Sequence, residues 1–125
     1  MSKKLHTENA PEAIGPYSQA IKVDHLLFVS GVMPIDPITN QLVESDINKQ
    51  AKQIMLNVDA ILKEAKMDAN CVVKTTCFLS DMKYFADFNK IYADYFISKP
   101  ARSCVAVKSL PKEALVEIEV IAYKE

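Results

Sequence analysis

The chain has 125 residues, half of them apolar and a quarter charged, with a formal net charge of -1. This length suits one domain with its own hydrophobic core, and we expect a single domain over residues 1–125. A nearly neutral chain has no long-range field that would favour nucleic acid or anionic lipid. No apolar run approaches the ~20 residues that a membrane-spanning helix needs, so we expect no membrane partner.

Cysteine usage and the start of the sequence indicate a cytoplasmic protein. The three cysteines, Cys71, Cys77 and Cys104, form no Cys-x-x-Cys pair, and an odd number fits a reducing compartment better than a disulfide framework. Residues 1–16 are polar and have neither the apolar core of a secretory leader nor the arginine-rich pattern of a transit peptide. We therefore expect a cytoplasmic location.

Two segments have the period of an amphipathic helix. Over residues 46–66 apolar residues recur every three or four positions, and Ser45 can cap the start. From about residue 81 or 82 to residue 96 the apolar stripe is aromatic, Ser80 or Asp81 can cap it, and Pro100 prevents a long continuation. Such a stripe is more typical of a core than of a ligand site. Asn89, at its edge, is either a core amide with a partner or a ligand contact.

The remaining segments indicate β-strands. They cover residues 18–23, 25–30, 71–79, 103–107 and 115–123, and a tight turn near residues 23–24 makes the first two a hairpin. In the last strand, Glu117 and Glu119 point away from the apolar side chains that alternate with them. Two helices on one face of a mixed sheet would bury both stripes, which predicts an α+β sandwich. The other face stays partly uncovered, and a partner subunit would be a sensible cover.

The common catalytic motifs are missing from the sequence. His6 and His25 do not stand at ligand spacing from other metal-binding residues, so we expect no metal site. There is no glycine-rich phosphate loop, nucleophile elbow or dinucleotide fingerprint. A catalytic pair of Cys104 with a histidine is not favoured, because nothing local activates the thiol.

Unusual residues gather where predicted strands meet loops, the usual place for site residues on a rigid scaffold. They are the segments 15–18, 30–34 and 100–104, together with Glu117. Gly15 and Gly31 are the only two glycines, where an average composition of ~7% would give about nine. Both are either ordinary turn residues or parts of a site.

Arg102 has two open interpretations. It alternates onto one strand face with Cys104, and its planar guanidinium matches a carboxylate through two parallel hydrogen bonds. That carboxylate belongs either to a ligand or to Glu117 or Glu119 of the chain itself. A tight hairpin through the Pro111 loop would bring Arg102 opposite Glu119 or Val120, but this register applies only if the last two strands are neighbours.

Several segments together resemble the RidA/YjgF family of enamine/imine deaminases. They are Ile14 to Ala20, Val29 to Gly31, Val73 to Thr76, Pro100 to Val105, Leu110 to Lys112 and Val116 to Glu119. The resemblance runs in the same order over essentially the whole chain. The stretch from Arg102 to Glu119 is the family's signature, and the presence of Arg102 makes the archetypal RidA subgroup the best fit.

This resemblance implies a chorismate-mutase-like α+β fold with a six-stranded mixed sheet, and a homotrimer with sites between subunits. The implied substrates are 2-aminoacrylate, 2-aminocrotonate and their imine tautomers, which pyridoxal-phosphate-dependent dehydratases release. The implied products are pyruvate or 2-oxobutanoate and ammonia, so the protein would remove reactive intermediates. No metal or organic cofactor is needed, because an iminium carbon is already electrophilic.

The resemblance also gives roles to individual residues. Arg102 would hold the substrate carboxylate, and Glu117 would position or activate water. The backbone N–H of Cys104 would bind substrate oxygens, and Tyr17 would close the pocket. Three more residues would line it, namely Ser30, Gly31 and Asn89. Val32 stands where the family often has glutamine, so one polar contact of that loop is expected to be missing.

Two other functions compete with this hypothesis. The chain could be a non-catalytic module that senses 2-oxo acids or small carboxylates through Arg102; it would then bind ligand without Glu117 and show no turnover. It could also act on RNA, as a translation inhibitor or ribonuclease, which the near-neutral charge and the absence of a basic stripe do not favour.

Overall fold

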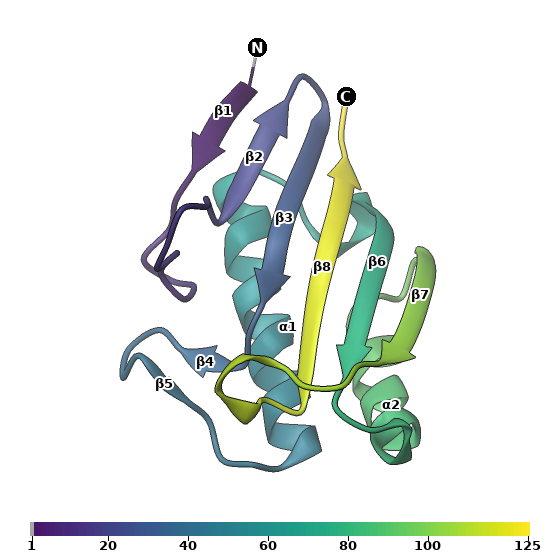
Figure 1. Ribbon diagram of the computed structural model, residues 1–125. Helices are drawn as coiled ribbons and strands as arrows, with labels where there is room; N and C mark the ends of the chain where they lie inside the picture. Colours follow the sequence, from purple (N-terminus) through teal and green to yellow (C-terminus); the bar gives the residue numbers. More distant parts are fainter. Residues whose placement is uncertain (1) are drawn as a thin grey trace.

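A computed structural model describes residues 2–125, so Met1, the first residue of the predicted domain, lies outside the described residues. Six strands form one sheet in the order β1-β2-β3-β8-β6-β7 (Figure 1). Their bounds are Ser2–Leu5 (β1), Ala20–Val23 (β2), Leu26–Val32 (β3), Val72–Leu79 (β6), Ala101–Ala106 (β7) and Val116–Tyr123 (β8). The two-residue strands β4 (Ile35–Asp36) and β5 (Gln41–Leu42) form a separate small hairpin.

The sheet is mixed, as predicted. Neighbouring strands are antiparallel except β6 and β7, which are parallel. A parallel pair needs a long crossover, and the helix α2 (Phe85–Tyr95) supplies it. Because β6 lies between β7 and β8, the last two strands of the chain are not neighbours. The hairpin register considered for Arg102 therefore does not apply.

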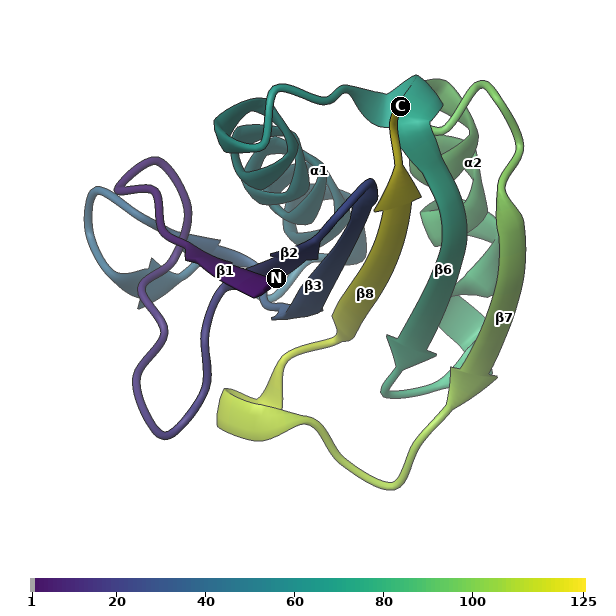
Figure 2. The ribbon, with the colours of Figure 1, turned by 90° about the horizontal axis from the view of Figure 1, so that it is seen from above.

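Both long helices, α1 (Ile47–Glu64) and α2, lie on one face of the curved sheet (Figure 2). Four apolar side chains of β8 point toward them and are at most 1% exposed; they are Val116, Ile118, Val120 and Ala122. No helix of residues 2–125 covers the opposite face of the sheet, where large apolar side chains such as Phe28, Val73 and Val105 are 43%, 47% and 46% exposed. The predicted α+β layout, with one face left open, is confirmed.

Both predicted helix starts need correction. Asp46, not Ser45, is the N-cap of α1, because its carboxylate accepts a hydrogen bond from the N–H of Lys49 at 2.9 Å. Asp81 caps a short 3-10 turn, η2 (Met82–Tyr84), and α2 itself begins only at Phe85. The α-helix therefore begins about one turn later than the capping residue suggests.

The sequence did not indicate β1, β4 or β5. β1 is an edge strand of four residues that contains Lys3 and Lys4, and only its last residue is buried. Charged side chains are usual on an edge strand, where they discourage pairing with other chains, but they hide the alternation of a strand. β4 and β5 are too short to show any period.

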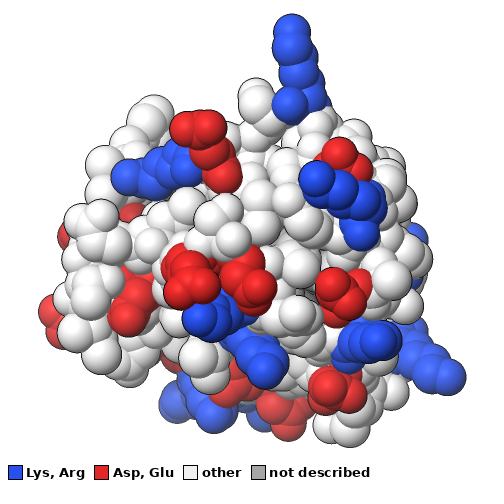
Figure 3. All heavy atoms as spheres, turned by 90° about the horizontal axis from the view of Figure 1, so that it is seen from below, with Lys and Arg blue, Asp and Glu red and all other residues white. Residues whose placement is uncertain are grey.

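Two surface features that would indicate a membrane or nucleic-acid partner are missing from the described residues: a membrane-spanning helix and, on the face shown in Figure 3, a patch of like charges. Among residues 2–125 no helix combines the length and the apolar character that crossing a bilayer requires. On the face shown in Figure 3, basic and acidic side chains are interspersed.

Buried amide side chains hold the loops against the helices and the sheet. These amides belong to Gln19, Gln50 and Asn57, which are 5%, 0% and 0% exposed. Their backbone partners are Thr7, Ala10 and Pro11 for Gln19, Val43, Glu44 and Leu115 for Gln50, and Met33 and Ile35 for Asn57. Each amide forms hydrogen bonds with backbone groups of a loop that would otherwise be buried without partners.

Asn57→Ala is expected to lower the free energy of unfolding by roughly 1–3 kcal/mol, because the carbonyls of Met33 and Ile35 lose their donor. Those hydrogen bonds measure 3.0 and 2.9 Å. Urea denaturation gives the comparison. Lys52→Ala, at an exposed position of the same helix, should change the free energy of unfolding by less than about 0.5 kcal/mol. Equal effects of the two substitutions would contradict a structural role for the amide.

Candidate functional site

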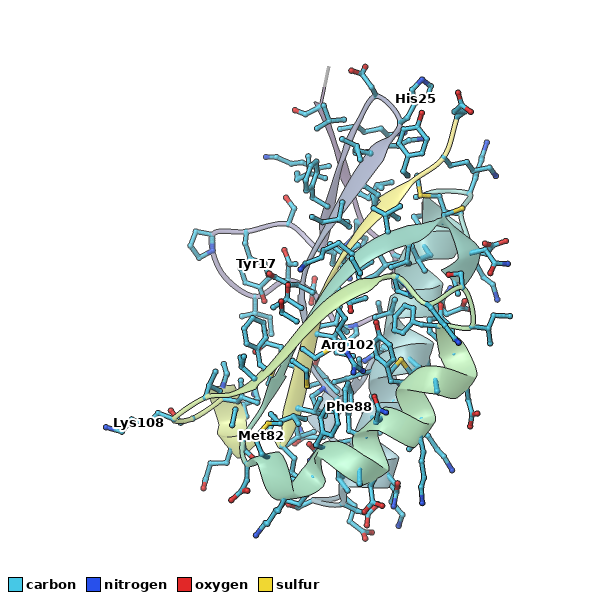
Figure 4. All side chains as sticks on the ribbon, turned by 90° about the vertical axis from the view of Figure 1, so that its right-hand side faces the viewer. Tyr17, His25, Met82, Phe88, Arg102 and Lys108 are labelled. Carbon is cyan, nitrogen blue, oxygen red and sulfur yellow. The ribbon has the colours of Figure 1, made fainter. Side chains whose placement is uncertain are left out.

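Arg102 lies on the helix side of β7, against α2 (Figure 4). Its Nη1 donates a hydrogen bond to Oδ1 of Asn89 at 2.6 Å. Its guanidinium carbon lies 4.6 Å from the ring centroid of Tyr92 and 5.5 Å from that of Phe85. A neutral amide and two aromatic faces therefore surround the cation. Asn89 fits both of its predicted roles, because its amide is the hydrogen-bond partner of Arg102 and also lines a cavity beside Arg102.

No carboxylate of residues 2–125 forms a salt bridge with Arg102. The internal ion pair with Glu117 or Glu119 is therefore wrong, and the reason lies in the sheet. Arg102 pairs in register with the buried Thr75 on the helix face, whereas Glu117 and Glu119 alternate onto the open face of β8. The charge of Arg102 stays uncompensated, beside a cavity of about 480 Å³.

Glu117 stands on the open face next to Gly31. A Cβ added at Gly31 would lie 2.9 Å from Cδ of Glu117 and would overlap its Oε2, so a side chain there would push the carboxylate away. The register between β3 and β8 shifts between Val29 and Val32, which brings the backbone of Gly31 to this position. Burial, together with repulsion from Glu119, raises the pKa of Glu117 above its ordinary value of 4.5.

Tyr17 and Ser30 belong to the same region as Gly31. The three residues line a small cavity of about 60 Å³, and Tyr17 is 54% exposed. The hydroxyl of Ser30 donates to the carbonyl of Ser18 at 2.6 Å, so it fastens the Tyr17 loop to β3. Gly15 has a φ of 132°, a conformation that favours glycine and turns the chain just before Tyr17.

Cys104 faces α2, like Arg102, and is paired in register with the buried Cys77 of β6. Burial raises the pKa of both thiols, that of Cys77 to about 12. A thiol with a raised pKa is a poor nucleophile, because the thiolate is the reactive form. Among residues 2–125, no three His, Cys, Asp or Glu side chains gather closely enough to hold a metal ion.

The predicted site residues thus form two groups on opposite faces of the sheet. The arginine half-site contains Arg102, Asn89 and Cys104; the glutamate half-site contains Glu117, Gly31, Ser30 and Tyr17. Figure 4 shows Arg102 beside α2 and Tyr17 on the other side of the sheet. A molecule of a few atoms cannot touch Arg102 and Glu117 of one chain at once, because they lie on opposite faces of the sheet and β6 separates their strands.

Sequence reasoning missed Tyr92 and Thr75 as neighbours of the site. Tyr92 belongs to the aromatic stripe that is typical of a core, and it is only 6% exposed. The sequence signal that places Tyr92 near the site is its position three residues after Asn89, because residues three apart share a helix face. Val32 is 5% exposed and packs in the core, so its side chain adds no polar contact to that loop.

Comparison with known proteins gives consistent matches over the whole chain. The family model described as Endoribonuclease L-PSP matches residues 7–124. A RutC family protein from Pyrococcus horikoshii is 52% identical over 126 residues, which cover 100% of both chains. A protein of the conserved Rid family from Yersinia pestis is 50% identical with a TM-score of 0.97, over 99% of this chain and 100% of that one. The E. coli protein TdcF, crystallised with bound serine, is 37% identical with a TM-score of 0.94, over 98% and 99%.

Glu117→Gln is expected to raise the free energy of unfolding at neutral pH. The pKa of Glu117 is higher in the folded protein than in the unfolded chain, so the native state loses stability as pH rises from about 4.5 through the folded pKa. Glutamine avoids this loss, and the advantage of the variant should vanish below about pH 4.5. Urea denaturation across this pH range measures it.

The raised pKa of Glu117 can be measured directly by NMR titration of its carboxyl carbon. Glu119→Gln removes the neighbouring charge and should lower the pKa of Glu117, while the part that burial causes remains. A pKa of Glu117 at or below 4.5 in the native protein would contradict the assignment of both causes.

Proposed function

Because the chain belongs to the RidA/YjgF family, we propose that it is a 2-iminobutanoate/2-iminopropanoate deaminase, which hydrolyses reactive 2-imino acids and their enamine tautomers to 2-oxo acids and ammonia. The observation that carries the proposal is the uncompensated charge of Arg102. A half-buried guanidinium with neutral partners keeps donors for an incoming anion, whereas an ion-paired one would not.

The carboxylate of the substrate would bind Arg102. Asn89 occupies one edge of the guanidinium through Nη1, and the remaining N–H groups can form the two parallel hydrogen bonds that a carboxylate accepts. The serine bound to TdcF, itself a small molecule with a carboxylate and a nitrogen on the next carbon, is of the same chemical kind. Small 2-imino acids such as those derived from serine or threonine fit this requirement.

Glu117 would act on the water. In the reaction, water adds to the imine carbon while one of its protons passes through Glu117 to the nitrogen, which gives a carbinolamine. The hydroxyl proton of this carbinolamine then passes through Glu117 to the amino nitrogen as the C–N bond breaks, so ammonia leaves and the 2-oxo acid remains. A carboxylate with a raised pKa is a better base, since general-base catalysis is most effective near the working pH. Imines already hydrolyse in water, so positioning and one base, together worth roughly 10²–10⁴-fold, are adequate.

One chain alone cannot bring these groups together, so we propose that the site forms between subunits of a homotrimer. The arginine half-site of one chain would face the glutamate half-site of the next. The open sheet face, with the exposed Phe28, Val73 and Val105, supplies apolar surface for such a contact. Pyridoxal-phosphate-dependent dehydratases, which release 2-enamino acids, would supply the substrate.

The description of the matching family as an endoribonuclease makes RNA the second candidate ligand. Electrostatics do not support it for this chain. Its net charge is -1, and the charges on the face in Figure 3 are of both signs, whereas RNA binding usually requires a basic patch. The same preparation of protein can be tested for RNA binding at low and high salt, and strong salt-sensitive binding would favour this second function.

The protein is expected to accelerate the formation of 2-oxobutanoate when a threonine dehydratase generates the imine in the same solution. Arg102→Ala should lower kcat/KM by roughly 30-fold or more, as expected when one partner of a desolvated charge pair is removed. Arg102→Lys should also fail substantially, because an ammonium cannot form the two parallel bonds. Lactate dehydrogenase, or derivatisation of the 2-oxo acid, follows the product.

Asn89 offers a matched pair of controls. Asn89→Asp places a carboxylate 2.6 Å from the guanidinium and should compete with substrate nearly as severely as loss of Arg102. Asn89→Ala removes the partner without adding charge and should be milder. An unchanged rate in Arg102→Ala would rule out the deaminase. A wild-type protein that binds ligand without any turnover, with binding that survives Glu117→Ala, would identify the sensing module instead.

Mixing two inactive variants tests the shared site. When Arg102→Ala and Glu117→Ala chains are unfolded together, refolded and allowed to assemble at random, each junction has one chance in four of combining two intact halves. Activity should return to about one quarter of the wild-type value in a cyclic assembly. The two variants assembled separately and then mixed are the control, and a mixed assembly without activity would contradict a site shared between chains.

A further inference from the structure

Tyr92 connects the arginine half-site to the middle of the sheet. Its ring lies under the guanidinium of Arg102, with the guanidinium carbon 4.6 Å from the ring centroid. Its hydroxyl and that of Thr75 are 2.7 Å apart in a buried hydrogen bond. Thr75 is fully buried and is the register partner of Arg102 across the β6–β7 ladder. The same pair of strands therefore holds both the arginine and the residue that fixes the ring beneath it.

We infer that Tyr92 and Thr75 are positioning residues of the proposed deaminase: the Thr75–Tyr92 hydrogen bond fixes the aromatic ring on which Arg102 lies, and so sets the plane in which Arg102 receives the substrate carboxylate. The inference rests on the proposed function, because it concerns the grip of Arg102 on that carboxylate.

The guanidinium of Arg102 needs the contacts with both Asn89 and Tyr92, because either contact alone leaves one of its motions free. The hydrogen bond to Asn89 fixes one nitrogen of the guanidinium but allows the plane to rotate about that bond. The ring of Tyr92 removes this rotation, because a guanidinium prefers to lie over the face of an aromatic ring. Phe85, whose ring centroid is 5.5 Å from the guanidinium carbon, limits it on another side. Pre-orientation matters because an anchor that must first be ordered binds less tightly.

The hydroxyl of Tyr92 has no evident packing purpose. The ring already lies among Phe88 and Phe96, with centroid distances of 5.8 and 4.6 Å, and a phenylalanine would fill this cluster equally well. Thr75, likewise, occupies a buried position of β6 where valine has the same shape. The hydrogen bond between two buried hydroxyls adds little to stability, because replacing both partners by apolar groups of the same shape can be nearly neutral. A fixed ring orientation is what the pair adds.

The experiment compares Tyr92→Phe with Tyr95→Phe. Both substitutions remove one phenolic hydroxyl from α2, and both break a side-chain hydrogen bond, since Tyr95 donates to Asp59 at 2.8 Å. Only Tyr92 touches Arg102. The measured quantities are the dissociation constant for 2-oxobutanoate by NMR titration, kcat/KM in the dehydratase-coupled assay, and the midpoint of thermal unfolding.

Tyr92→Phe and Thr75→Val should each weaken 2-oxobutanoate binding by roughly 3- to 10-fold, the effect of one neutral hydrogen bond, and should lower kcat/KM to match. The double variant should be no worse than either single variant, because both break the same bond. Tyr92→Leu, which removes the ring, should weaken binding by more than Tyr92→Phe does, up to roughly 30-fold. Tyr95→Phe should shift the unfolding midpoint without changing binding.

The outcomes separate the two hypotheses. A wild-type protein that neither binds 2-oxobutanoate nor accelerates imine hydrolysis overturns the proposed function. A wild-type protein that does both, while Tyr92→Phe behaves like Tyr95→Phe in binding and turnover, overturns the positioning role and leaves the function standing. Additive losses in the Thr75→Val/Tyr92→Phe double variant would also overturn it, because they would show that the two hydroxyls act independently.

Discussion

The alternation of side chains along β8 is the constraint on which the rest of the molecule depends. This strand lies between β3 and β6 in the sheet, and its four core side chains are at most 1% exposed beneath the two helices. A shift of one residue would send these four to the open face and bring two carboxylates into the core. The register is therefore fixed by burial, and it places Glu117 on the face opposite Arg102.

This arrangement explains why Arg102 can remain without an ionic partner. A buried arginine is usually paired, because an unpaired charge loses hydration that nothing replaces. Here an amide oxygen and two ring faces contact the guanidinium, and none of these groups carries a charge. The loops that carry the other half-site are held by buried amides and by the Ser30 hydroxyl, so both halves stand on supports that do not need a ligand to become ordered.

Local patterns predicted much of this fold, and non-local contacts account for what they left out. The helix period, the β2–β3 turn and the shared face of Arg102 and Cys104 follow from residues close in sequence. The parallel neighbours β6 and β7 do not, because their pairing depends on the path of α2. The partner of Arg102 could not be chosen either: Asn89 and the two glutamates are all polar, and only the sheet order shows that the amide lies within reach.

The neutral surroundings of Arg102 also have a consequence for selectivity. A guanidinium without a counter-ion attracts any small planar anion, and acetate or lactate presents the same two oxygens as an imino acid. The charge of Arg102 therefore determines how often the cavity is occupied, but it does not select which carboxylate occupies it. In a medium rich in metabolic acids, most of the anions bound in the cavity would be carboxylates that cannot react. The rate at which the proposed deaminase removes a scarce imine would depend on how quickly these competitors dissociate. Fast exchange would then matter more than tight affinity.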